Sequence, residues 1–222
     1  MSLSTIFNRY VTWPARQLIG GFWDHVYRVE TRGGVISDES LGITSENRDK
    51  GVVYDPTPWS VVKTVAQLLP KGQPDFCFVD VGSGKGRVIM AAAALPYRRV
   101  VGVEYSPYLC RIANENLQSQ RILPRRTGQV SIVCGDATEF PIPNGACIFF
   151  FYNPFAPEII ERMISNMVAS FQEQPRELYL VFFASSKAIS GLKPDAHLLL
   201  RKQSAVRCDL FYWRSVSVYQ IA

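Results

Sequence analysis

Three glycines at alternate positions follow an acidic residue in the segment 80–86, which reads DVGSGKG. Apolar residues precede Asp80 and an alanine-rich stretch follows Arg87, so the glycines join a strand to a helix. A glycine turn at the carboxyl end of a strand lets the backbone approach a ligand closely, because glycine has no Cβ and tolerates positive φ. About twenty residues later a second apolar strand ends in Glu104, whose carboxylate can accept hydrogen bonds from both hydroxyls of a ribose. The sequence therefore predicts a site for an adenosine-containing cofactor.

The spacing of the glycines separates this loop from two other nucleotide-binding loops. Dehydrogenase loops read Gly-x-Gly-x-x-Gly, whereas Gly86 comes one residue early and an acid precedes the loop. A P-loop requires Ser or Thr after its lysine, whereas Lys85 is followed by Gly86. We therefore expect Lys85 to be a solvent-facing residue at the start of the helix.

Apolar strands alternate with amphipathic helices from residue 54 onward. The patterns predict strands at 77–81, 99–104, 130–134, 146–152 and 177–183, with helices between them and a short helix at 185–192. Two further strands, 197–206 and 210–221, are separated by Arg207, Cys208 and Asp209 alone, which leaves no room for a helix. The sequence therefore predicts a mostly parallel sheet of seven strands, flanked by helices on both faces and closed by a C-terminal antiparallel hairpin.

The composition limits the class of protein. A length of 222 residues, 47% hydrophobic and 19% charged, fits one α/β domain with a modest extension. The net charge of +5 permits anionic partners, but no lysine and arginine block has the length typical of nucleic-acid tails. The five cysteines are odd in number and contain no Cys-x-x-Cys, which favours a reducing, cytoplasmic compartment over a disulfide framework. With two histidines in addition, a metal site is not expected.

Residues 1–53 differ from the rest of the chain. We expect them to form an N-terminal extension, helical or irregular, that covers the active site of a domain at 54–222. The segment 1–23 carries Arg9 and Arg16 but no acid, and it holds five aromatic residues. Such a segment either packs on its own domain or lies as an amphipathic helix on a membrane surface or a partner. No run of 18 apolar residues predicts a membrane span.

Four motifs in this order resemble those of the class I S-adenosylmethionine-dependent methyltransferases. They are the glycine loop, Glu104, the triplet 135–137 (Gly-Asp-Ala) after the third strand and the triplet 153–155 (Asn-Pro-Phe) after the fourth. Each follows a successive strand, at the edge where parallel sheets bind ligands. The resemblance covers residues 54–221 and implies a three-layer α/β/α Rossmann-like methyltransferase fold. It also implies S-adenosylmethionine as cofactor, S-adenosylhomocysteine as product and no metal.

The resemblance assigns a role to each motif. The loop glycines bring the backbone to the methionine part of the cofactor, and Asp80 orients the loop and reaches the ammonium group directly or through water. Glu104 holds the ribose hydroxyls and Tyr105, or an apolar neighbour, packs on the adenine face. Asp136 accepts a hydrogen bond from the adenine amino group, and the Ala137 amide faces a ring nitrogen. The cofactor-binding residues implied in this way are Asp80, Gly82, Ser83, Gly84, Gly86, Glu104, Tyr105, Asp136, Ala137 and Asn153.

The triplet at 153–155 lies where a methyl acceptor is expected. Amino-group methyltransferases carry Asn/Asp-Pro-Pro-aromatic there, and the Asn side chain accepts a hydrogen bond from the target nitrogen. This chain is one proline short, and an ordinary strand-ending turn is the alternative interpretation. The segment 54–58 (Tyr-Asp-Pro-Thr-Pro) is similar to non-SET protein-lysine methyltransferases. Together with Thr31-Arg32-Gly33, it is also similar to a bacterial group of uncharacterised class I methyltransferases.

We therefore expect a methyltransferase acting on an amine nitrogen of a protein lysine or a small amine, with Asn153, Tyr54 and Tyr152 around the nucleophile. Two other classes stay open. One is an RNA or small-molecule O-methyltransferase; the basic loop 121–126 permits RNA, although no recognised RNA module is present. A non-catalytic protein that binds S-adenosylmethionine would keep the same cofactor motifs.

Overall fold

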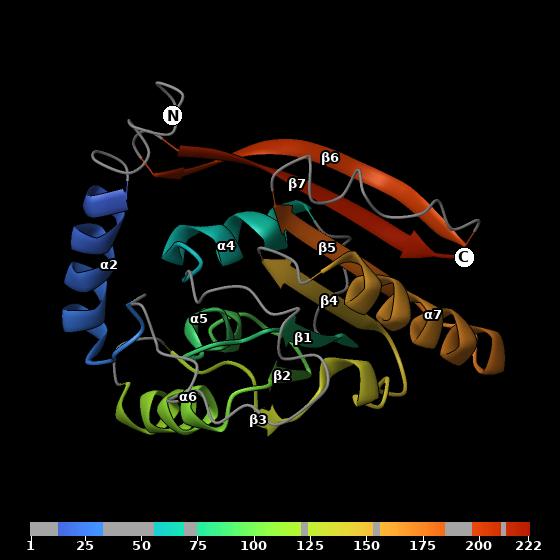
Figure 1. The fold of residues 1–222 in the computed structure, drawn as a ribbon, viewed down its shortest axis with the longest axis horizontal. Coiled ribbons are helices and arrows are strands. Elements are labelled where there is room, and N and C mark those ends of the chain that lie inside the picture. Colours follow the sequence, from blue (N-terminus) through green and yellow to red (C-terminus); the bar gives the residue numbers. More distant parts are fainter. Residues whose placement is uncertain are drawn as a thin grey trace.

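The computed structural model describes residues 13–32, 56–68, 75–120, 124–152, 156–184, 197–209 and 212–222. Its centre is a seven-stranded sheet in the order β3-β2-β1-β4-β5-β7-β6 (Figure 1). The strands are β1 (Cys77–Val81), β2 (Arg99–Glu104), β3 (Gln129–Cys134), β4 (Cys147–Tyr152), β5 (Leu178–Ala184), β6 (Leu198–Asp209) and β7 (Tyr212–Ile221). The first five run parallel, and β7 pairs antiparallel with both β5 and β6. The predicted three-layer fold with its C-terminal hairpin is confirmed.

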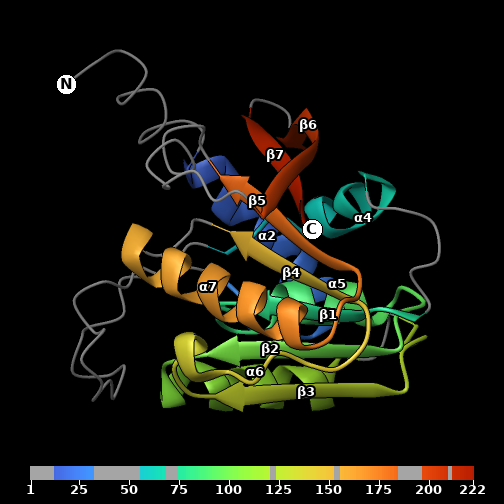
Figure 2. The same ribbon diagram turned by 90° about the vertical axis from the view of Figure 1, so that its right-hand side faces the viewer.

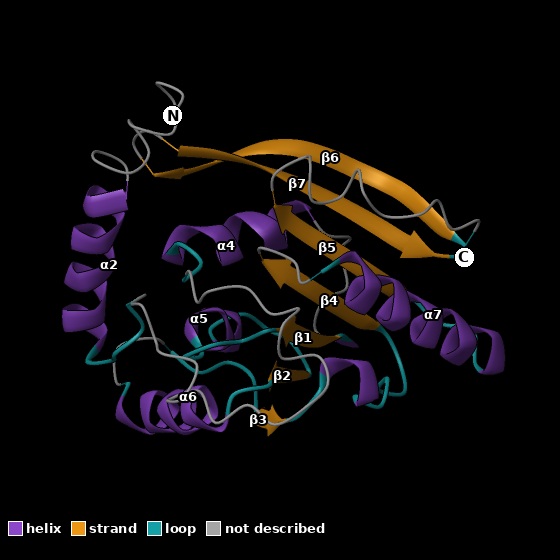
Figure 3. Ribbon diagram, viewed as in Figure 1, coloured by secondary structure: helices purple, strands orange, loops and turns teal. Residues whose placement is uncertain are grey.

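Helices cover both faces of the sheet (Figure 3). They are α2 (Trp13–Tyr27), α4 (Trp59–Leu68), α5 (Arg87–Ala93), α6 (Pro107–Ser119), the 3-10 helix η4 (Ala137–Glu139) and α7 (Pro157–Glu173). Figure 1 shows α4, α5 and α6 on one side of the sheet and α7 on the other, and Figure 2 shows α7 from its own side. Ser106 caps α6 through a hydrogen bond from the Leu109 N–H, and proline occupies the first position of both α6 and α7.

The central strands consist mostly of apolar residues because both of their faces are buried. Side chains of a strand alternate between faces, so Phe78 and Phe150 pack with α4 and α5 while Val79 and Phe149 pack with α7. Phe78 and Phe150 also stack on each other, with ring centroids 6.0 Å apart. This core fixes the register of the strands and therefore the positions of the residues at their carboxyl ends.

The hairpin differs in one detail from the prediction. Arg207, Cys208 and Asp209 were expected to form the connection, but β6 continues to Asp209. The pairing of β6 with β7 shifts register between Arg207 and Asp209, so the ladder passes these polar residues through an irregularity. The strand continues because ladder hydrogen bonds come from the backbone, whatever the side chains are. The predicted short helix at 185–192 lies outside the described residues.

Candidate functional site

The glycine loop turns sharply after β1. Gly82, Gly84 and Gly86 have φ values of 75°, 54° and 83°, in the left-handed region that favours glycine. The N–H groups of Gly82 and Ser83 donate to the Val103 carbonyl at 2.9 and 3.1 Å. The loop is therefore bonded back onto the end of β2, and its shape depends on glycine at these positions.

Gly102, in the middle of β2, lies under this loop. An ideal Cβ at Gly102 would be 2.6 Å from the Ser83 Oγ and 2.9 Å from the Ile132 Cδ1. The sequence interpretation assigned no role to Gly102. The signal was present, because a lone glycine inside an apolar strand marks the close approach of another segment.

Two carboxylates are buried at this edge of the sheet. Asp80 is 2% exposed and Glu104 is 8% exposed. Burial and the neighbouring Glu104 charge raise the pKa of Asp80 well above its ordinary value. Burial also raises the pKa of Glu104, although hydrogen bonds from backbone N–H groups oppose that shift.

The two acids differ in their hydrogen bonds. The Glu104 Oε2 accepts from the Gly84 N–H at 2.8 Å, and its Oε1 accepts from the Ser106 N–H at 2.9 Å. No donor to the Asp80 carboxylate occurs among the described residues, and no hydrogen bond contributes to the shift of its pKa. A buried acid beside a second acid and without a donor favours a cation as its ligand.

The ends of the first four strands meet at one edge. Val81 pairs with both Val103 and Phe151, and Glu104 pairs with Cys134. The structure thus brings together most of the predicted site residues. Those brought to this edge are Asp80, Gly82, Ser83, Gly84, Gly86, Glu104, Tyr105, Asp136, Ala137 and Tyr152.

Asp136 has a local structural role in addition to the predicted one. Its Oδ1 accepts hydrogen bonds from the N–H and the Oγ1 of Thr138, both at 2.8 Å, so it caps η4, which begins at Ala137. The Gly135 N–H donates to the Glu104 carbonyl at 2.8 Å and joins the ends of β2 and β3. The Asp136 Oδ1 therefore has the role of a turn-capping acid. The hydrogen bond from Asp136 to the adenine amino group stays a prediction.

The aromatic residues at this edge are partly buried. The Tyr105 hydroxyl is buried and has no hydrogen-bond partner in the part of the chain that the structure describes. Tyr152 ends β4 and stacks on Phe183, with ring centroids 5.4 Å apart. Tyr54 and Asn153 lie outside the described residues, as does the rest of the Asn-Pro-Phe triplet. The geometry around the acceptor stays a prediction.

Arg87, the first residue of α5, is a central contact that the sequence interpretation missed. It is 6% exposed. Its guanidinium donates to the Thr31 Oγ1 at 2.7 Å, to the Thr57 carbonyl at 3.2 Å and to the Asp24 Oδ1 at 3.3 Å. It also lies over the Trp59 ring, 5.4 Å from the centroid. Arg87 thus joins α2, the segment after it and the start of α4 to the glycine loop.

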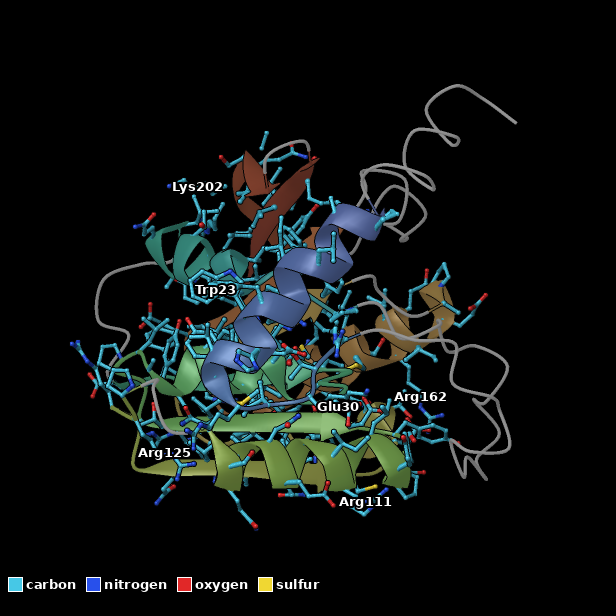
Figure 4. The ribbon with its side chains drawn as sticks, turned by 90° about the vertical axis from the view of Figure 1, so that its left-hand side faces the viewer. Trp23, Glu30, Arg111, Arg125, Arg162 and Lys202 are labelled. Carbon is cyan, nitrogen blue, oxygen red and sulfur yellow. The ribbon has the colours of Figure 1, made fainter. Side chains whose placement is uncertain are left out.

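The expectation that Lys85 faces solvent is wrong. Lys85 is 6% exposed, and its Nζ forms an ion pair with the Glu30 Oε1 at 2.5 Å. Asn116 donates to the carbonyls of both Glu30 and Lys85 at 2.9 Å and accepts from the Glu30 N–H at 2.8 Å. The segment 28–32, which we call the strap, therefore covers Lys85; Figure 4 shows Glu30 just beyond the end of α2.

The sheet order and the glycine loop define a class I methyltransferase fold. Residues 78–173 match the family model described as a methyltransferase domain. This match and the fold confirm the predicted resemblance to the class I S-adenosylmethionine-dependent methyltransferases.

One curated relative is a protein-lysine N-methyltransferase of Saccharolobus islandicus (strain REY15A), 33% identical over 101 residues. The match covers 45% of this chain and 60% of the relative. A methyltransferase structure from Methanosarcina mazei has a TM-score of 0.53 at 15% identity, covering 71% of this chain and 96% of that one. The structure of magnesium protoporphyrin IX methyltransferase from Synechocystis PCC 6803, with bound S-adenosylmethionine, has a TM-score of 0.54 at 16% identity. The match covers 100% of this chain and 98% of that one. These two structures establish the fold.

The described residues contain neither a metal-binding cluster nor a membrane-spanning helix. No group of three or more His, Cys, Asp or Glu side chains there is arranged to hold a metal ion. No helix there has both the length and the apolar character needed to cross a bilayer. The cysteines that the structure describes, Cys77, Cys110, Cys134 and Cys147, are free thiols.

Proposed function

We propose that this protein is an S-adenosylmethionine-dependent methyltransferase that acts on an amine nitrogen of a protein lysine or a small amine. One observation carries the cofactor assignment. The Asp80 carboxylate is buried beside the glycine loop without a donor among the described residues, and the ammonium group of the cofactor's methionine part is the cation that it would receive. The match of residues 78–173 to a methyltransferase domain supports the same assignment.

The residues present fit this cofactor. The Glu104 carboxylate accepts from the N–H groups of Gly84, Ser106 and Tyr105. A carboxylate has about four lone-pair positions, so Glu104 can still accept from a ribose hydroxyl. The Ser83 Oγ and the Tyr105 hydroxyl are buried without a partner among the described residues. A buried polar atom without a partner is costly, so a polar ligand at these positions would offset that cost. We assign Asp136 and Ala137 to the adenine.

The cofactor would supply an electrophilic methyl group for direct displacement by a nucleophile. The contribution of the chain is to hold the nucleophile in line, and such alignment lowers a barrier by several kcal/mol. We place Tyr54, Tyr152 and the Asn153 side chain around the amine, with the Asn153 oxygen accepting a hydrogen bond from it. An amine that arrives neutral requires no general base.

The amine acceptor rests on two similarities. The curated relative is named as a protein-lysine N-methyltransferase, and the segments 54–58 and 153–155 partly match amino-group enzymes. A small-molecule acceptor is the alternative, because one structural neighbour is named for a porphyrin. The free thiols favour a reducing compartment, so we place the reaction in the cytoplasm.

Calorimetric titration with S-adenosylhomocysteine, with NAD as comparison, tests the cofactor. We expect micromolar binding that Asp80→Ala and Glu104→Ala abolish. Glu115→Gln is the matched control, because this acid is exposed on α6 and pairs only with Arg111 in the described part. No binding, or preference for NAD, would contradict the proposal.

Methyl transfer from labelled S-adenosylmethionine to peptides, small amines and RNA tests the acceptor. Labelled lysine or amine would support the proposal, and Asn153→Ala should reduce that turnover. Labelling of RNA or of an oxygen alone would contradict the amine assignment. Binding of the cofactor without any turnover would indicate a non-catalytic binding protein.

A further inference from the structure

Helix α2 presents its apolar side chains outward. Leu18 is 76% exposed, Phe22 61%, Ile19 40% and Trp23 37%. Of the six large hydrophobic residues that are exposed in the described part of the chain, these four lie on this one helix. Phe22 and Trp23 contact each other edge to face, with ring centroids 5.3 Å apart, so they form one continuous surface. We call these four residues the α2 outer face.

The opposite side of α2 is attached to the domain by polar contacts and by Tyr27, whose ring centroid lies 4.7 Å from that of Trp59. Asp24 is 4% exposed and lies 3.3 Å from the Arg87 guanidinium. A Cβ added to Gly20 would be 3.3 Å from that guanidinium, and one added to Gly21 would be 3.3 Å from Arg32. This arrangement is the reverse of an ordinary surface helix, which turns its apolar stripe toward the core. Turning the α2 outer face inward would break the buried contact between Asp24 and Arg87.

The charges around the α2 outer face are mainly positive. The sequence has no acid before Asp24, and Asp24 itself is buried beside Arg87. Arg16 belongs to α2 and Arg28, just beyond the helix, is exposed, while the exposed acid in the strap, Glu30, is paired with Lys85. Figure 4 views α2 from its outer side, with Trp23 labelled beside the helix, toward α4. An apolar surface with basic neighbours is complementary to a partner surface that is both apolar and negatively charged.

We propose that the α2 outer face docks this protein on an anionic lipid bilayer. Leucine, phenylalanine and tryptophan on one face with nearby arginines are the composition of helices that lie in the plane of the membrane interface. The helix has 15 residues, fewer than the ~20 needed to span a bilayer, so it lies on the surface. The arginines add attraction to anionic headgroups, and salt weakens that attraction. This inference does not depend on the proposed methyl transfer.

Vesicle flotation tests the docking. The wild-type chain is expected to float with vesicles of phosphatidylcholine and phosphatidylglycerol, and to float less with phosphatidylcholine alone or at high salt. The variant Leu18→Ser/Phe22→Ser should lose at least about tenfold in binding, because it removes two large apolar side chains that the bilayer would bury. The matched control is Leu199→Ser/Leu200→Ser, which removes exposed leucines from β6. It should bind like the wild type.

Three results would overturn the inference. They are no flotation of the wild type, equal flotation of the α2 variant, or equal loss in the β6 control. Thermal unfolding of each variant shows that it is folded, and the α2 variant should unfold like the wild type. Sedimentation equilibrium tests a second copy as the occupant: a dimer that the α2 variant abolishes, without lipid binding, would replace the bilayer with another protomer.

Discussion

Substitution of Gly102 by alanine should displace the glycine loop, because the added Cβ on β2 would clash with Ser83 in that loop. The added Cβ would lie 2.6 Å from the Ser83 Oγ, 2.9 Å from the Ser83 Cβ and 2.9 Å from the Ile132 Cδ1. Comfortable carbon contacts are ~3.5–4.0 Å, so Ser83 has to move by roughly 0.5–1 Å. That movement strains the hydrogen bonds from Gly82 and Ser83 to the Val103 carbonyl.

The size of the effect follows from this overlap. Overpacking a well-packed site costs about 1–3 kcal/mol. We expect the free energy of unfolding of Gly102→Ala to fall by that amount in urea denaturation. If the loop moves with Ser83, S-adenosylhomocysteine binding should weaken about tenfold or more, since ~1.4 kcal/mol corresponds to a factor of ten. Calorimetry measures the second effect.

A double-mutant cycle with Ser83→Gly separates the causes. Removing the Ser83 side chain relieves two of the three close contacts, so the double variant should lose less stability than the sum of the two single variants. Gly128→Ala is the control, because a Cβ there meets nothing within 4 Å. Wild-type stability and affinity in Gly102→Ala would refute the account of how β2 supports the loop.

Three further outcomes are expected. Asp80→Asn should raise the melting temperature of the ligand-free protein near neutral pH while weakening S-adenosylhomocysteine binding, as scanning calorimetry and titration would measure. Because its pKa is raised, Asp80 binds a proton more tightly in the folded than in the unfolded protein, so the stability of the wild type falls as pH rises from ~4 through the folded pKa. The difference in melting temperature between Asp80→Asn and the wild type should therefore vanish near pH ~4. Arg87→Leu should cost ~3–5 kcal/mol in urea denaturation, because it leaves Asp24 buried without its guanidinium. Glu30→Gln should change stability by less than ~1 kcal/mol, since the Glu30 side chain is 66% exposed in its pair with Lys85.

The sequence predicts the fold well because its signals are local. Apolar runs such as 147–152, CIFFFY, mark strands buried on both faces, and the short gap after residue 206 forces a hairpin. The glycine spacing, followed by Glu104, locates the cofactor edge for the same reason, since parallel strands bring their carboxyl ends together.

The contacts that the sequence did not predict join distant segments. Lys85 was expected in solvent, yet its partner, Glu30, lies 55 positions earlier, and Arg87 meets Asp24 across 63 positions. Neither pairing has a periodicity or a spacing to reveal it. Local patterns can also mislead. The polar residues up to Asp209 are typical of a turn, yet β6 continues through them because its ladder hydrogen bonds come from the backbone.

These distant contacts assign a role to the N-terminal extension. The backbone of the glycine loop is bonded inward to the end of β2, while Lys85 and Arg87 reach outward to Glu30, Thr31 and Asp24. A buried ion pair is weak support for stability, because desolvation of the two charges opposes their attraction. The contact between Arg87 and Asp24 does fix the orientation of α2 relative to the start of α5, because a guanidinium donates hydrogen bonds only along defined directions in its plane. We infer that the end of α2 and the strap position the cofactor loop from outside, as β2 does from inside. A variant that lacks residues 1–32 should therefore bind the cofactor more weakly even if the rest of the domain remains folded.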